Sequence, residues 1–206
     1  MNLPFQGVRV DKKLVIGAVV VLVALALLYI FVLSAPTAKS ALESNGFREN
    51  DFQGSGPVYF DGTSFQRSTS RESLTVLRAS LVDIQNSLIA SSQEKAKAEL
   101  LVSSINHELK QDAFFSEIES MGSSITAQNP WENCDKLPGL YEFREKQNEL
   151  YADAIDLSLK DSQISFDNGL GESFLGIDLE QEKTILEDLD YLISIMENYC
   201  PQGSVA

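Results

Sequence analysis

The sequence contains few of the residues that build metal centres or nucleophilic catalytic sites. Its 206 residues include one histidine, His107, and two cysteines, Cys134 and Cys200. A structural zinc site takes four cysteine or histidine ligands, so this chain cannot assemble one by itself. His107 precedes Glu108 but has no second histidine four residues later, which excludes the zinc-protease helix motif. We therefore expect no catalytic residue, no metal ligand and no cofactor, and predict that the chain is not an enzyme.

Basic residues are also scarce. The chain carries 16 lysines and arginines against 30 aspartates and glutamates, a net charge of −14. Three cations, Arg9, Lys12 and Lys13, and one anion, Asp11, lie in the first thirteen residues, which leaves 13 basic and 29 acidic residues, or −16, in the rest. A surface of this sign repels nucleic acid and anionic lipid headgroups, so we expect neither as a ligand.

Long apolar runs are absent except for one near the N-terminus. Residues 14–33, LVIGAVVVLVALALLYIFVL, contain no charged residue. Twenty helical residues span about 30 Å, the thickness of the hydrocarbon core of a bilayer. A cleaved secretion signal has a shorter apolar core, of about 7–15 residues, and ends at small residues. We therefore predict an uncleaved transmembrane helix over residues 14–33, with a cleaved signal as the alternative.

The charges on the two sides of this segment predict its orientation. Three cations precede it, whereas Lys39 is the one cation that follows closely and Glu43 offsets it. Basic flanks stay in the cytoplasm. We therefore expect a single-pass protein of the cell membrane, with residues 1–13 as a short cytoplasmic tail and the C-terminal domain outside the cytoplasm.

Residues 34–67 are rich in glycine, asparagine, aspartate and serine, which predicts a juxtamembrane tether. We expect residues 38–45 to prolong the membrane helix, and residues 58–60 to form a short extended piece that turns at 61–62. The tether also carries more aromatic side chains than a solvated linker would. We expect them to pack against the domain, and the alternative is a partner-binding patch. These aromatic residues are Phe47, Phe52, Tyr59, Phe60 and Phe65.

A helical period begins near residue 69, where Thr69 and Glu72 fit a capping box. The register of its apolar face continues through the polar stretch 90–97. Two structures therefore fit: one long helix with a polar middle, ending at Gly122 or near 129–130, or a hairpin that turns near 91–92. The preserved register favours the long helix, because a turn has no reason to keep the phase. The apolar face comprises Leu74, Leu77, Leu81, Ile84, Leu88, Val102, Ile105 and Leu109.

Two further helices are predicted toward the C-terminus. The first runs from about residue 138 to 160, since Pro138 is tolerated in a first helical turn. Three glycines between residues 169 and 176 then interrupt the helical period. The second helix begins after Asp178, which fits an N-cap with Gln181 completing a capping box. Pro201 stops this helix, and residues 201–206 form a C-terminal tail.

The two cysteines flank these helices. Cys134 lies just before the first of them, and Cys200 lies at the end of the second. If the two helices form an antiparallel hairpin, both cysteines fall at the same end, within bonding distance. Outside the cytoplasm, a pair of cysteines is typical of a disulfide. We therefore predict a Cys134–Cys200 bridge.

Two remaining features are interpreted as structural. His107 lies off the apolar face of its helix, so we expect its side chain to be exposed. The glycine-rich segment GLGESFLG, residues 169–176, lacks a preceding apolar strand and a following GK[ST]. It is therefore interpreted as a loop between helices and not as a phosphate-binding loop.

Together these patterns predict an all-α protein with an N-terminal single transmembrane helix, followed by an extracytoplasmic bundle of three or four helices over residues 68–200. We favour a structural, assembly or scaffold role in a cell-envelope complex. Residues 14–33 would bind the lipid bilayer. Other envelope or membrane proteins, or a second copy of the chain, would be the partners.

Two other functions remain open. The alternative is a helical-bundle ligand-binding (sensor) module that acts through a membrane partner, which predicts a cavity between helices with converging polar groups. The third hypothesis is a hydrolase, which requires two buried carboxylates that face each other. Only the acidic surplus of the sequence supports it.

Overall fold

The computed structural model of the chain describes residues 20–26, 29, 35–54, 58–60, 65–67, 70–122 and 130–200. The chain divides into two compact units, Met1–Pro36 and Thr37–Ala206. In the first unit, residues 20–26 and 29 are helical. The rest of the predicted transmembrane segment, 14–33, lies outside the described residues. Within the described ranges, the structure has no helix that combines the length and the apolar character needed to cross a membrane.

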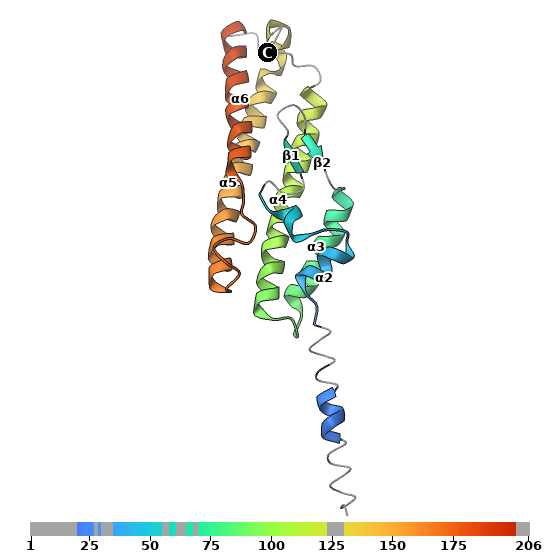
Figure 1. Cartoon of the computed structure of the whole chain (residues 1–206). Helices are drawn as coiled ribbons and strands as arrows, with labels where there is room; N and C mark the ends of the chain where they lie inside the picture. The colour runs from blue at the N-terminus through green and yellow to red at the C-terminus, as the bar shows by residue number, and fades with distance from the viewer. Residues whose placement is uncertain are drawn as a thin grey trace, which may run out of the picture. The chain divides into compact units, whose positions relative to one another are not determined.

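The second unit is built around four long helices: α3 (Arg71–Asn86), α4 (Ser92–Gly122), α5 (Leu137–Asp167) and α6 (Leu179–Tyr199). They pack in chain order, with α3 against α4, α4 against α5 and α5 against α6 (Figure 1). The helical class predicted from the sequence is thus confirmed for the described part of this unit. Its short elements are α2 (Ala38–Ser44), the 3₁₀ turns η1 (Glu49–Phe52) and η2 (Pro130–Lys136), and the strands β1 (Val58–Phe60) and β2 (Phe65–Arg67).

The two short strands form an antiparallel hairpin, which the predicted all-α class did not include. Val58 pairs with Arg67, and Phe60 pairs with Phe65. The extended piece predicted at residues 58–60 is confirmed. The turn predicted at 61–62 lies outside the described residues, and so do the side chains of Tyr59, Phe60 and Phe65.

Helix α2 is a separate helix, so the prediction that residues 38–45 prolong the membrane helix is wrong. Residues 35–37 are not helical. Pro36 disfavours the helical conformation at the residue before it. Thr37 then starts a new helix: its hydroxyl accepts a hydrogen bond from the Ser40 N–H (3.1 Å), and the Ser40 hydroxyl accepts one from the Thr37 N–H (3.3 Å). This reciprocal capping box satisfies two backbone donors that a helix start leaves free.

Helices α3 and α4 form a hairpin, so the favoured prediction of one long helix is wrong. The Ser87 hydroxyl accepts hydrogen bonds from the backbone N–H groups of Ile89 and Ala90, both at 3.2 Å. The Ser91 hydroxyl accepts one from the Glu94 N–H (3.2 Å) and so caps α4. Serine side chains that bond nearby backbone groups compete with the helical ladder, which explains the break. Leu88, predicted on the apolar face, lies in the turn and is fully exposed.

Two apolar clusters form the core of this unit. The first joins α2, η1, α3 and the N-terminal half of α4, and it contains Phe47 and Phe52, which are 5% and 0% exposed. The partner-binding alternative is therefore corrected for these two residues, because their rings pack inside the domain. The second cluster joins the C-terminal half of α4 to α5 and α6. Its larger members include Phe114, Phe115, Phe143, Ile193 and Met196.

The segment between α5 and α6 is organised by one buried carboxylate. Asp161 is fully buried on α5 and accepts a hydrogen bond from the Ser165 hydroxyl (2.9 Å) and one from the Ser173 hydroxyl. Helix α5 continues past the predicted end at Lys160 to Asp167, which places Asp161 inside it. Three backbone N–H groups also donate to this carboxylate, at 2.8 to 3.1 Å: those of Phe174, Leu175 and Gly176.

The hydrogen bonds to the Asp161 carboxylate fix the path of the chain between α5 and α6. They hold the loop so that Leu175, 1% exposed, enters the first apolar cluster. Gly169 follows the α5 C-cap with a φ of +67°, the left-handed conformation that glycine adopts at helix ends. Asp178 then caps α6 as predicted, accepting from the Glu180 N–H (3.0 Å). The cap of α3 is Ser70, one residue after the predicted Thr69.

We predict that Asp161→Ala lowers the free energy of unfolding by more than about 2 kcal/mol, because the substitution leaves buried backbone donors without an acceptor. Urea unfolding of the full chain in non-ionic detergent, followed by circular dichroism, measures the change. Asp167→Ala, at an exposed carboxylate one and a half turns later, is the control and should change stability by less than about 0.5 kcal/mol. Equal effects of the two substitutions would contradict the role assigned to Asp161.

The structure contains the predicted disulfide between Cys134 and Cys200. Their Cα atoms lie 5.5 Å apart, although 66 positions separate them in the sequence. Cys134 belongs to η2 and Cys200 is the C-cap of α6, so the bond holds the C-terminus of α6 beside the start of α5.

We predict that Cys134→Ser/Cys200→Ser lowers the free energy of unfolding by about 2–4 kcal/mol, since the bridge closes a long loop in the unfolded chain. The same urea titration tests this. Mild reduction of the unsubstituted chain should reproduce the loss. If neither treatment moves the midpoint, the bridge does not stabilise the domain.

Candidate functional site

The buried face of α4 changes from apolar to polar in the middle of the helix. Up to Ile105 it contributes to the first apolar cluster, and from Phe114 to the second. From Ser104 to Asp112 the buried side chains other than Ile105 are polar, with exposed fractions of 2–7%. They are Ser104, Glu108, Gln111 and Asp112. This interval is where α4, α5 and α6 bring polar groups together.

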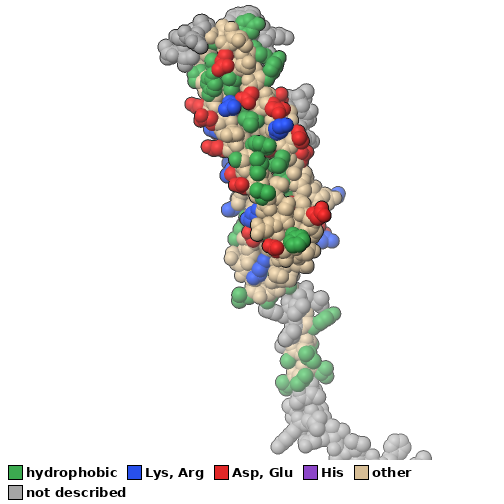
Figure 2. Space-filling view, turned by 90° about the vertical axis from the view of Figure 1, so that its left-hand side faces the viewer, with side chains coloured by type: hydrophobic (Ala, Val, Ile, Leu, Met, Phe, Trp, Pro, Cys, Tyr) green, Lys and Arg blue, Asp and Glu red, His purple; other side chains and the backbone are tan. Residues whose placement is uncertain are grey.

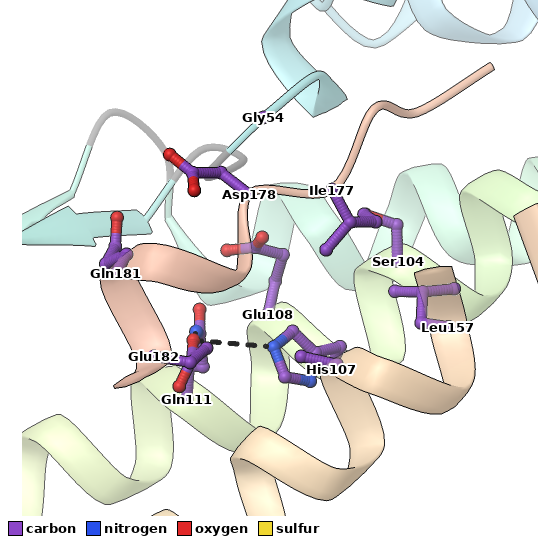
Figure 3. A pocket seen from close by; sticks show the side chains of 11 residues that line it. Gly54, Ser104, His107, Glu108, Gln111, Leu157, Ile177, Asp178, Gln181 and Glu182 are labelled. Carbon is purple, nitrogen blue, oxygen red and sulfur yellow. Dashed lines mark hydrogen bonds and ion pairs between the residues drawn. The ribbon is translucent and has the colours of Figure 1, made fainter. Parts of the chain in front are cut away.

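The centre of this arrangement is Glu182, on the first turn of α6 and only 3% exposed. Its carboxylate accepts a hydrogen bond from the Gln111 amide of α4 and one from the Gln147 amide of α5, the latter at 2.6 Å. The Gln147 amide also donates to the Glu182 carbonyl at 3.1 Å. His107 Nε2 lies 3.6 Å from the carboxylate (Figure 3). We call these four residues the polar node: His107, Gln111, Gln147 and Glu182.

Three buried polar atoms of the polar node have no hydrogen-bond partner among the described residues: His107 Nδ1, Gln111 Oε1 and Gln147 Oε1. A cavity of ≈ 20 Å³ lies beside it, and its lining includes His107, Gln111 and Glu182. Such a volume suits a single water molecule, which requires two to four polar partners. The cavity is far below the few hundred cubic ångströms of a ligand pocket.

The prediction that His107 is exposed is wrong. Its side chain is 11% exposed and lies against Glu182. The error arises because the apolar pattern places only apolar residues in the interior, whereas here Glu182, in the first turn of α6, lies against the polar side of α4. The sequence does carry a signal, since His107 and Gln111 stand four residues apart and so share one face. The shared face of His107 and Gln111 indicates a buried polar site only when the position of Glu182 is known.

The arrangement limits the chemistry that the polar node can perform. Glu108 and Glu182 are both 3% exposed and both line the cavity, which gives it two buried carboxylates. With His107 these carboxylates can bind and orient a water molecule. The cavity has no room for an organic substrate. In the described part of the chain, no group of three His, Cys, Asp or Glu residues is arranged to hold a metal ion.

Two wider clefts, of ≈ 260 and ≈ 230 Å³, follow the seam between α4 and α5. Their rims carry three lysines, but each forms a cross-helix ion pair. The lysines therefore bring no net positive charge to either cleft, and nothing favours an anionic ligand there. The pairs are Glu99–Lys160, Lys110–Asp153 and Glu117–Lys146.

Comparisons with known proteins add no precedent: no family model, no curated protein and no solved structure matches this chain. The residues singled out from the sequence also do not form one site. Cys134 and Cys200 form the disulfide, Phe47 and Phe52 lie in the first apolar cluster, and the polar node is separate from both.

We predict that Glu182→Ala lowers the free energy of unfolding by about 2–3 kcal/mol, because it leaves the buried amides of Gln111 and Gln147 without their acceptor. Glu187→Ala, on the same helix with its side chain 65% exposed, is the matched control and should change stability by less than about 0.5 kcal/mol.

A double-mutant cycle provides the decisive measurement. In Gln147→Leu/Glu182→Leu both partners become apolar, so the loss should be smaller than the sum of the two single losses. Strict additivity would show that the two side chains do not interact.

Proposed function

We propose that this chain is a membrane-anchored structural or assembly subunit of a cell-envelope complex. Its helical domain would lie outside the cytoplasm and bind other envelope proteins through a helix face. The membrane part is supported by the apolar sequence 14–33 and by the exposure of apolar side chains at residues 20–26. Val20, Leu22 and Leu25 are 59–65% exposed, as expected for a helix whose surroundings are lipid.

The observation that carries the assembly role is an apolar row on the outer face of α5. Its members recur at steps of three, four and seven, so they share one side of the helix. The neighbouring positions on this side are Asp156, Ser162 and Gln163, so Asp156 is the one charged residue beside the row over four turns. The row consists of Ala152, Ile155, Leu159 and Phe166, of which Ile155 is half-buried and the others are exposed.

The row lies on the part of α5 that α6 does not cover. Glu182, on the first turn of α6, contacts Gln147, and α5 continues for twenty residues beyond that point. On the face that carries α5 and α6, hydrophobic side chains follow the middle of the surface and charged side chains flank them (Figure 2). An apolar strip with a polar border is the usual form of a helix-binding surface.

Nearer its N-terminus, α5 already has α6 as a partner, and polar pairs close the outer edge of that contact. The Tyr141 hydroxyl donates to Glu197, and this hydrogen bond raises the pKa of Tyr141. Arg144 donates to Asp190, which raises the pKa of the guanidinium. The apolar row has no such polar pairs. In a domain with a strong acidic surplus, the row is a surface with few acidic side chains, so a partner meets little charge repulsion there.

We predict that a photo-crosslinking residue at position 159 captures a specific partner, or a second copy of the chain, in native membranes. Val76 is the matched control, since it is an aliphatic residue of α3 with 53% exposure against 65% for Leu159. Leu159→Lys should abolish the adduct and the co-purification of the partner, whereas Val76→Lys should not. If both positions capture the same set of proteins, or neither captures any, the apolar row is not an interface.

The polar node supports a second candidate function, a ligand-sensing module. The three unpartnered polar atoms beside a cavity between helices favour it, although the cavity would have to open to admit anything larger than water. The crosslinking experiment separates the two functions. A sensor without an assembly role would show no dependence on Leu159.

A further inference from the structure

Three chain segments meet at one end of the domain. The Ala38 N–H, at the start of α2, donates to Glu94 Oε2 in the first turn of α4 (2.6 Å). The neighbouring Gln93 amide donates to the Asn168 carbonyl at the C-terminus of α5 (2.9 Å). We call this end, which also contains the α3–α4 turn at residues 87–91, the proximal end. In Figure 1 it is the lower end of the helical domain.

The proximal end carries the two most exposed large apolar side chains among the described residues. Leu88, at the tip of the α3–α4 turn, is 100% exposed, and Phe166, in the last turn of α5, is 80% exposed. Residues 86–93, which surround Leu88, include no charged residue. The four residues before Phe166 are also uncharged. Protruding apolar side chains in an uncharged setting are unusual on a domain with an excess of acidic residues.

The start of α2 follows closely in sequence after the predicted transmembrane segment. Thr37, the cap of α2, follows Leu33, the last residue of the predicted transmembrane segment, by four positions. An extended chain covers at most about 14 Å in four residues. If residues 14–33 span a bilayer, the start of α2 therefore lies within that distance of the apolar core. The α3–α4 turn and the end of α5 are tied to α2 by the hydrogen bonds above.

We propose that the proximal end is a lipid-contact surface, where Leu88 and Phe166 insert into the interfacial layer of the bilayer that holds residues 14–33. The inference rests on the proposed membrane anchoring. Isolated Leu and Phe side chains enter this layer because it removes apolar surface from water. Asp167, next to Phe166, and the acidic surplus of the domain favour zwitterionic over anionic headgroups.

Two inserted side chains on separate segments, together with the membrane helix, give three attachment points. Three points that are not in line fix the tilt of a rigid body on a surface, whereas one tether leaves it free to swing. The proximal end of the domain would face the bilayer, and the apolar row of α5 would lie at a fixed distance from the bilayer surface. Phe166, the last residue of that row, would be its one member in contact with lipid.

The test uses the full chain in phosphatidylcholine nanodiscs, with the environment-sensitive dye NBD on a single introduced cysteine. Both native cysteines are in the disulfide, so no other thiol reacts. Leu88→Cys and Phe166→Cys are compared with Val76→Cys, an exposed aliphatic position near the other end of α3. We expect the emission at positions 88 and 166 to shift to shorter wavelength, with loss of quenching by aqueous iodide and gain of quenching by spin-labelled lipid. Position 76 should show none of these changes.

The outcomes separate this inference from the function on which it rests. If the protein elutes with the nanodiscs but iodide quenches the labels at 88 and 166 as strongly as the label at 76, the lipid contact is wrong and the anchoring stands. If the protein does not elute with nanodiscs at all, the anchoring is wrong and the contact with it. If the labels are shielded only when other native membrane proteins are present, the end binds a protein and not lipid.

Discussion

The relative position of the helices in this domain depends on one buried carboxylate, that of Glu182, which requires hydrogen-bond donors. Glu182 lies where the two apolar clusters end, and its donors come from two other helices: Gln111 from α4 and Gln147 from α5. A shift of α6 along its axis would leave the buried carboxylate without both amide donors, and a shift of α4 or α5 would remove one of the two. Apolar packing holds the helices together, and the polar node selects their relative position.

Different interactions act on the two sides of the node. On the proximal side, Asp161 gathers the backbone of the loop after α5 and directs Leu175 into the first apolar cluster. On the other side, the covalent bond between Cys134 and Cys200 holds α6 against α5. The loop between α5 and α6 can therefore contain three glycines and still keep a defined shape, because the Asp161 side chain of α5 holds its backbone.

The sequence predicted the parts of the fold that follow from apolar periodicity and from local caps. The positions of α3, α5 and α6 and the disulfide are of this kind, because each depends on residues close in sequence or on a single pairing. The α3–α4 hairpin was only the second choice because Ser87 and Ser91 act through side-chain hydrogen bonds that leave the apolar register unchanged. The polar node was missed because polar residues at buried positions produce no periodic signal, and their burial depends on a helix seventy residues away.

The disulfide has a consequence for how the protein withstands proteases. One route for cleavage in the described part of the domain is the glycine-containing loop after Asp167, where six residues are exposed. A cut there separates α6 from the remainder of the backbone. Cys134 lies in the N-terminal fragment and Cys200 in the C-terminal one, so the nicked molecule stays in one piece, and α6 remains in place to keep Glu182 between its two amide donors.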